Sequence, residues 1–408
     1  MPQEYFALIL GYIFGFYMAW NIGANDVANS MASVVATKAI TIRQAVFIAA
    51  VLNIIGATFI GTHVTNTIRK SIVSTDVLTD PHVAIIGTLS ALLAAALWVS
   101  FSTWKSLPVS TTHSIVGAMI GFGIMAGGFS VVNWFNLAAV AMSWVISPLF
   151  SIVIAFVMFK IIVKLILSIR DPFARALKLL PLFVGVTFFI VVLSFLFKTP
   201  LGQTLAIDTA AALLIAVILS TFCGITGKLI LERIVAPNAS NGVEEIFKRI
   251  QVVMACYVAL AQGANDVANA IGPLAVIYFL AKTGSVGSKV SVPTFLLLFG
   301  GTGIACGIAM AGQRVMETLG KKITTLSNTR GFSVNFAAAT TVLAASKMGM
   351  PVSTSHAAVG GVLGVGLAGG IEAVNFNIVF KIILYWVLTV PASAFTSMAI
   401  FKTLRLLF

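Results

Sequence analysis

The feature that most constrains this chain is a polar stretch, Gly-Ala-Asn-Asp-Val-Ala-Asn, that occurs twice without a change, at residues 23–29 and again at residues 263–269. Each copy lies within apolar sequence; residues 6–20 and 31–39 flank the first one. Ionisable side chains inside a membrane span are energetically costly, and those that occur there usually serve a function. The two stretches therefore predict a functional site inside a membrane.

The composition supports the membrane interpretation. Of the 408 residues, 59% are hydrophobic and only 9% are charged, whereas soluble domains carry about 25% charged residues. Apolar runs long enough to cross a bilayer, about 20 residues, recur along the chain, for example at residues 179–197, 205–222 and 378–401. We therefore expect an all-α polytopic membrane protein. No basic segment precedes the first apolar stretch, so we expect a retained helix there and not a cleaved signal peptide.

The charge and the cysteines exclude other classes of protein. The net charge is +13, which in a soluble protein would suggest nucleic-acid binding. Here Lys and Arg lie mostly between the apolar runs, where anionic lipid headgroups and the positive-inside rule account for them. We therefore predict contacts with membrane lipid and no nucleic-acid partner. The three cysteines stand in apolar sequence without motif spacing, so they predict neither a metal site nor a disulfide.

A second motif shows that the duplication extends along the chain. The motif Pro-Val-Ser-Thr-Thr-His at residues 108–113 recurs, with one change, as Pro-Val-Ser-Thr-Ser-His at residues 351–356. Matching glycines and residue pairs follow in the same order, so residues 5–165 and 245–408 are predicted to be two copies of one transmembrane unit. Residues 166–244 would hold two linking helices and a polar linker. If each copy crosses the membrane an odd number of times, the copies have inverted topology, a frequent plan of secondary transporters.

The Pro-Val-Ser-Thr motifs favour an anion site. A proline fixes φ where a helix would begin, and the hydroxyl residues that follow are good N-cap types. The start of a helix leaves backbone N–H groups unpaired and carries a partial positive charge, so it suits an anion. An ordinary helix cap would explain one lone copy, but two copies at membrane depth favour anion binding. The candidate anion ligands are Ser110, Thr111, Thr112, Ser353, Thr354 and Ser355.

The Asn-Asp stretches favour a cation. Carboxylates repel anions, so Asp26 and Asp266 need a cation or a proton nearby. With amide oxygens, hydroxyls and the carbonyls of an interrupted helix, each Asp would form an all-oxygen site, and sodium fits the weak, reversible binding that a transporter needs. The alternative is that each Asp caps a broken helix or pairs with Lys. The candidate sodium ligands are Asp26, Asp266, Asn25, Asn265, Asn29 and Asn269.

The histidines of the second motif, His113 and His356, leave two interpretations open. They can orient the motif through a hydrogen bond, or they can relay protons. Because both repeat with the hydroxyl residues, the same question applies to each copy.

At these residues the chain resembles the inorganic phosphate transporter (PiT) family of sodium- or proton-coupled phosphate symporters. The duplicated motifs carry the resemblance, together with Gly-Lys-Lys-Ile-Thr at residues 320–324. The resemblance covers essentially the whole chain and implies about twelve helices, with broken helices and re-entrant hairpins, two inverted repeats, a central phosphate site and a homodimer. It extends the phosphate site to Asn25 and Asn265. One departure is the residue before the repeated stretch, Ile22 in the first copy and Gln262 in the second, which makes Gln262 a candidate phosphate ligand without a counterpart.

We therefore expect sodium-coupled symport of inorganic phosphate across the cell (inner) membrane by alternating access, without an organic cofactor or enzymatic activity. A proton-coupled phosphate permease or a sulfate permease is the nearest alternative. An anion channel would need no paired carboxylates. A membrane-embedded phosphatase would need a nucleophile with a base, which Ser110 near His113 could imitate, and usually a tightly held metal. Symmetric duplication of the site suits alternating access better than a single reaction centre.

Overall fold

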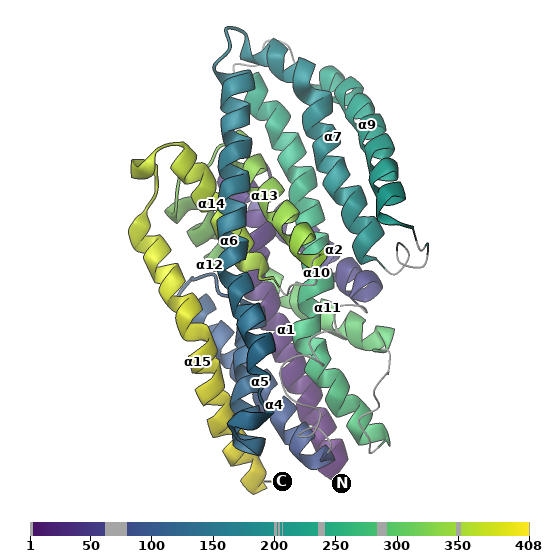
Figure 1. The fold of residues 1–408 in the computed structure, drawn as a ribbon, viewed down its shortest axis with the longest axis vertical. Helices are drawn as coiled ribbons and strands as arrows, with labels where there is room; N and C mark the ends of the chain where they lie inside the picture. Colours follow the sequence, from purple (N-terminus) through teal and green to yellow (C-terminus); the bar gives the residue numbers. More distant parts are fainter. Residues whose placement is uncertain are drawn as a thin grey trace.

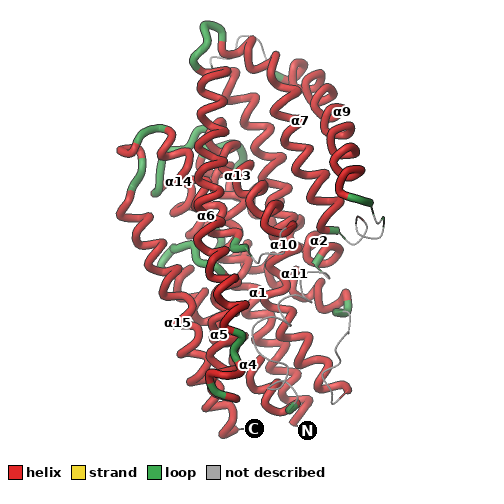
Figure 2. The backbone as a smooth tube through the Cα atoms, viewed as in Figure 1, coloured by secondary structure: helices red, strands yellow, loops and turns green. Residues whose placement is uncertain are grey.

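The computed structural model of the chain describes residues 3–61, 80–199, 207–235, 241–283, 292–347 and 352–407, together with residues 202 and 205. Figure 2 shows that this described part is built of helices joined by loops; it contains 13 α-helices and no strand, which confirms the predicted all-α fold. Nine of the described helices are long and apolar enough to cross a membrane: α1 (Gln3–Ala36), α2 (Ile42–Ile60), α4 (Pro81–Trp104), α6 (Trp134–Ile162), α7 (Pro172–Lys198), α9 (Thr209–Ile234), α10 (Gly242–Thr283), α11 (Thr294–Ala311) and α15 (Phe376–Leu407).

The helices that begin at the Pro-Val-Ser-Thr motifs are apolar but shorter than these spans. They are α5 (Thr111–Gly127) and α14 (Thr354–Ala368), which pack against the helices that precede them, α4 and α13 (Asn328–Lys347). The re-entrant hairpins expected from the family resemblance stay a prediction, since α4 is itself long and apolar enough to cross a membrane. The remaining helix, α12 (Gln313–Glu317), packs against α1.

The helices α1 and α10 run without a break through the Asn-Asp stretches. They are 34 and 42 residues long and stay helical across residues 21–30 and 261–270. The prediction that these stretches interrupt a helix is therefore wrong. Their polar side chains find partners on other elements, so the backbone keeps the hydrogen bonds of a regular helix.

Glycines at equivalent positions of the two copies let helices cross at backbone distance. A Cβ at Gly23 of α1 would strike the carbonyl of Ile304 in α11, and one at Gly263 of α10 would strike the backbone of Asn53 in α2. Only glycine permits such an approach between membrane helices. The short helices follow the same rule across the copies: α5 meets α15 at the pairs Gly117–Val390 and Gly121–Ala394, and α14 meets α6 at the pairs Gly360–Pro148 and Gly364–Ile152.

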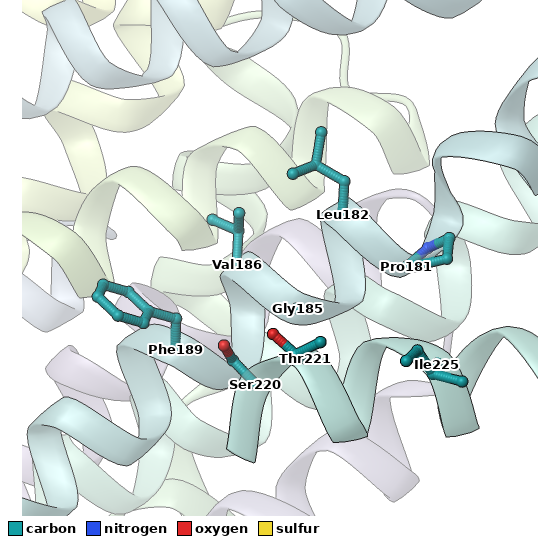
Figure 3. Close-up of a pocket in the computed structure, with 8 residues that line it drawn as sticks. All are labelled: Pro181, Leu182, Gly185, Val186, Phe189, Ser220, Thr221 and Ile225. Atoms are coloured by element: carbon teal, nitrogen blue, oxygen red, sulfur yellow. The ribbon is translucent and has the colours of Figure 1, made fainter. Parts of the chain in front are cut away.

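The helices α7 and α9 pack on each other at one flank of the molecule, away from α15 (Figure 1). A groove of about 340 Å³ lies on their surface, lined mostly by apolar side chains with Ser220 and Thr221 among them (Figure 3). Both hydroxyls donate to the carbonyl of Val217, at 3.0 and 2.7 Å, within their own helix. The groove therefore offers no spare hydroxyl donor, and it lies apart from the duplicated motifs.

The crossing at Gly121 predicts a stability difference between two glycines of membrane helices. Gly121→Ala places a methyl group against the carbonyl of Ala394, whereas at Gly185 the nearest atom, the carbonyl oxygen of Ser220, is 3.3 Å from an added Cβ. We expect Gly121→Ala to lower the melting temperature of the detergent-purified protein, because overpacking costs about 1–3 kcal/mol. Gly185→Ala is the control: its contact needs a shift of only a few tenths of an ångström, so it should melt close to the wild type. Equal melting of the two variants would refute the close crossing.

Candidate functional site

The structure brings the two duplicated motifs together inside the protein. The middles of α1 and α10 carry the Asn-Asp stretches, and the starts of α5 and α14 face them. The carboxylate residues Asp26 and Asp266 are 0% and 4% exposed, respectively. Of the other candidate residues, Thr112, Thr354 and Asn265 are half-buried, and the remainder are buried: Asn25, Asn29, Ser110, Thr111, Gln262, Asn269, Ser353 and Ser355.

The carboxylate of Asp26 joins the starts of both short helices. Thr111 of α5 donates its hydroxyl to Oδ2 at 2.8 Å, and Ser355 of α14 donates to Oδ1 at 3.1 Å. These two residues come from different copies of the motif. Among the described residues, the other group that bonds this carboxylate is the neutral amide of Asn29, at 3.5 Å. The alternative in which Asp26 pairs with Lys therefore has no support in this geometry.

The asparagines at the end of each polar stretch reach across to the other copy. Asn29 of α1 donates its amide to Thr354 and Ser355 at 3.2 and 3.0 Å. In the same way Asn269 of α10 donates to Thr111 and Thr112 at 3.4 and 3.1 Å. The arrangement is thus two-fold related, although the partners lie far apart in sequence.

Several oxygens of the site remain available for a cation. The amide oxygens of Asn29 and Asn269 are buried and have no hydrogen-bond partner among the described residues. The side chain of Asn29 contacts Asp26 directly, and the amide of Asn269 donates to Thr111, which in turn donates to Asp26. An unpartnered buried acceptor is unfavourable by about 1–3 kcal/mol, so these oxygens suit a hard cation that prefers oxygen ligands.

The side chain of Asn25 is bonded to the segment that precedes α5 and to the end of α4. Its amide donates to Thr103 at 2.9 Å and to the carbonyl of Leu107 at 3.1 Å, and its oxygen accepts from the N–H of Val109 at 3.0 Å. Both ends of the side chain are therefore occupied by the segment that leads into α5. Asn25 holds this segment in place.

Ser110 and Ser353 are the N-caps of the two short helices. Each hydroxyl oxygen accepts from the backbone N–H three residues later, that of His113 or His356, at 3.2 Å. The two serines are thus ordinary caps, and the hydroxyls of the next two residues face the aspartates and asparagines. Gln262 differs from all of these residues, since both polar atoms of its side chain are buried without a partner among the described residues.

A polar network beside the site was not predicted. Ser33 of α1 donates to Asn335 of α13 at 3.1 Å, and Gln251 of α10 donates to Thr37 at 2.8 Å. The signal that could have revealed it is a strict spacing of four along α1, because residues at this spacing are neighbours on a helix. That series is Asn21, Asn25, Asn29, Ser33 and Thr37. The equivalent series in α10 ends in apolar residues, so polar side chains continue beyond the site along α1 but not along α10. That series is Ala261, Asn265, Asn269, Pro273 and Ile277.

Membrane-length helices that enclose two carboxylates and two hydroxyl-bearing helix starts define a polytopic membrane transport protein. The chain belongs to the phosphate transporter family, whose model matches residues 22–397. It is thus a multi-pass permease of the cell membrane and not an enzyme.

Similar proteins extend over almost the whole chain. A protein of Pyrococcus furiosus named as a phosphate permease is 48% identical over 401 residues, with 98% of this chain and 97% of the relative covered. The chloroplastic inorganic phosphate transporter 2-1 of Arabidopsis thaliana is 41% identical over 423 residues, with 94% and 69% covered. A solved structure described as the sodium-dependent phosphate transporter matches with a TM-score of 0.90 at 43% identity, covering 98% of this chain and 100% of that one.

The contacts of Asn25 predict that it contributes to stability more than Gln262 does. Asn25→Leu removes three hydrogen bonds and leaves the N–H of Val109 and the carbonyl of Leu107 without their partner, at about 1–3 kcal/mol for each buried group. Gln262→Leu, the matched control, removes a side chain with no partner. In thermal unfolding without ligand, Asn25→Leu should melt well below the wild type and Gln262→Leu should not. A reversed order would contradict the assigned roles.

Proposed function

We propose that this permease couples the transport of inorganic phosphate to sodium by alternating access. The observation that carries the proposal is the pair of hydrogen bonds from the two helix starts to Asp26, because they put candidate anion ligands and a candidate cation ligand in contact. The sodium dependence stated for the similar solved structure supports the same reading.

Phosphate would bind between the starts of α5 and α14. The unpaired backbone N–H groups of the first helical turns supply donors, and the helix starts supply partial positive charge. The hydroxyls of Thr111, Thr354 and Ser355 each have one hydrogen, which points to an aspartate here; they would turn to the phosphate once sodium binds the carboxylates, and Thr112 would join them. Ser110 and Ser353 would act mainly as caps that keep these donors in place. Gln262, with a free buried amide, would add a donor from one side only.

Sodium would bind between the carboxylates and the phosphate. Asp26 and Asp266 supply charge, and the free amide oxygens of Asn29 and Asn269 supply neutral ligands. Coupling has an electrical reason, since one charge that crosses the membrane against the potential costs about 2.3 kcal/mol per 100 mV. Two sodium ions carried with HPO4 2− remove this cost, and two equivalent aspartate sites provide for two ions.

Alternating access would use the duplication. We infer that residues 5–165 and 245–408 are two copies of inverted topology that rock against each other around the central site, as in other inverted-repeat transporters. A homodimer embedded in membrane lipid is the assembly that we propose. Proton-coupled phosphate transport and sulfate transport are the rival functions, and the two experiments below separate them.

The first experiment tests coupling through the carboxylates. A carboxylate beside phosphate repels it unless a cation lies between them, so sodium should tighten phosphate binding, and phosphate should tighten sodium binding by the same factor. Asp26→Asn and Asp266→Asn should each weaken this mutual effect. Phosphate affinity is measured across a sodium series at fixed pH. Asp208→Asn, at the exposed N-cap of α9, is the matched control and should keep the full sodium dependence. An affinity flat in sodium and steep in pH would establish proton coupling instead.

The second experiment tests the anion. Phosphate near neutral pH keeps a proton that it can donate, and sulfate does not. The free amide oxygens of Asn29 and Asn269 and the carboxylates can accept that proton, and the same oxygens repel a fully ionised anion. Arsenate, with the shape and protonation of phosphate, should therefore compete for uptake of radiolabelled phosphate into proteoliposomes, and sulfate should not. Equal competition by sulfate would overturn the choice of substrate.

A further inference from the structure

His113 and His356 lie against each other between the starts of α5 and α14. Their ring centroids are 4.5 Å apart, with an angle of 83° between the ring planes. Each ring also contacts a tryptophan of its own copy: the centroids of His113 and Trp144 are 3.9 Å apart, and those of His356 and Trp386 are 3.7 Å apart. Both histidines are buried. These four rings join the two short helices to α6 and α15.

The hydrogen bonds of the two histidines differ although their motif is repeated. Nδ1 of His356 lies 3.1 Å from the backbone carbonyl of Trp144. A carbonyl only accepts, so the Nδ1–H of His356 donates. Both ring nitrogens of His113 are buried without a partner among the described residues.

A proline explains this difference. Pro148 lies inside α6, four residues after Trp144. Proline has no N–H, so the carbonyl of Trp144 loses its donor within the helix, and inside a membrane such a carbonyl must be satisfied by another part of the protein. In α15 the proline stands one residue later in this register, at Pro391, so the carbonyl it deprives of a donor is that of Val387. The carbonyl of Trp386 keeps the N–H of Val390, four residues on, as its donor in the helix. The position equivalent to Trp144 in α15 thus has no freed carbonyl, and His113 makes no bond there.

A second hydrogen bond ties the same pair of helices. Ser151 of α6 donates to the carbonyl of Ala357, the residue after His356, at 2.6 Å. The counterpart of Ser151 is Ser393 of α15, whose hydroxyl is buried without a partner among the described residues. The helix α14 is thus held on α6 by two bonds. The start of α5 is tied to α15 differently, by the indole N–H of Trp386, which donates to the carbonyl of Pro108 at 3.1 Å.

We propose that His356 is a positioning residue of the transport site and that His113, in the same motif, is not. Resting on the proposed function, His356 replaces the donor that Pro148 removes and so fixes where α14 begins. Its own backbone N–H is capped by Ser353, and the neighbouring Ser355 donates to Asp26. A displacement of His356 along α6 would therefore move the hydroxyls of α14 away from the aspartate and from the bound phosphate.

The first test compares phosphate binding to purified variants in saturating sodium. His356→Phe keeps a ring against Trp386 and loses the Nδ1–H donor. We expect its phosphate affinity to fall about three- to tenfold, the effect of one hydrogen bond. His356→Asn carries an amide N–H near the position of Nδ1 and should recover most of the affinity. His113→Phe, the matched control, loses no hydrogen bond and should bind like the wild type.

The second test separates positioning from stability. Pro148→Ala restores a backbone N–H to the carbonyl of Trp144, so in the double variant with His356→Phe the melting temperature should return toward that of the wild type. The hydrogen bond from residue 356 to α6 is still absent and only that of Ser151 remains, so phosphate binding should stay weak. Recovery of affinity together with melting temperature would show a merely structural role and overturn the proposal, as would an equal loss of affinity in His113→Phe. A wild type that binds no phosphate would instead defeat the proposed function.

Discussion

The structure depends on the hydrogen bonds that the carboxylate of Asp26 accepts from Thr111 and Ser355. A carboxylate inside a membrane is tolerated only when the protein surrounds it with donors or a cation. Here the donors come from the starts of two short helices, one from each copy of the repeated unit. The same contacts that satisfy the acid therefore bring the two Pro-Val-Ser-Thr motifs to one place, and the amides of Asn29 and Asn269 complete the arrangement from both sides.

Close helix crossings make this convergence possible. Each short helix packs, through glycines, on the last long helix of the other copy, as at Gly121 against Ala394 and Gly364 against Ile152. A methyl group at such a glycine would strike a backbone carbonyl, so the depth at which the helix starts lie is set by backbone contact. The two copies thus depend on each other for the geometry of the site.

The two copies are equivalent in plan and different in detail. At equivalent positions of the two copies, Ile22 corresponds to Gln262 and Pro148 corresponds to Val390. Beyond Asn29 the residues at a spacing of four are polar in the first copy, whereas those beyond Asn269 in α10 are apolar. Each difference changes which polar atoms are free or satisfied on one side of the site. A transporter that moves ions in one net direction does not need two identical halves, and single substitutions are enough to make the halves unequal without changing the fold.

The sequence by itself determined the membrane class, the duplication and the residue types of the site, because composition, repeat spacing and polar residues at membrane depth are local properties of the chain. It also pointed to Asp26 and to the hydroxyls of Thr111 and Ser355. Only the tertiary structure decided that α1 continues through the Asn-Asp stretch, that Asn25 supports a loop, and that Asn29 bonds to hydroxyls more than 300 residues away. A motif specifies which groups need partners, and helices that cross between the copies decide which partners they meet.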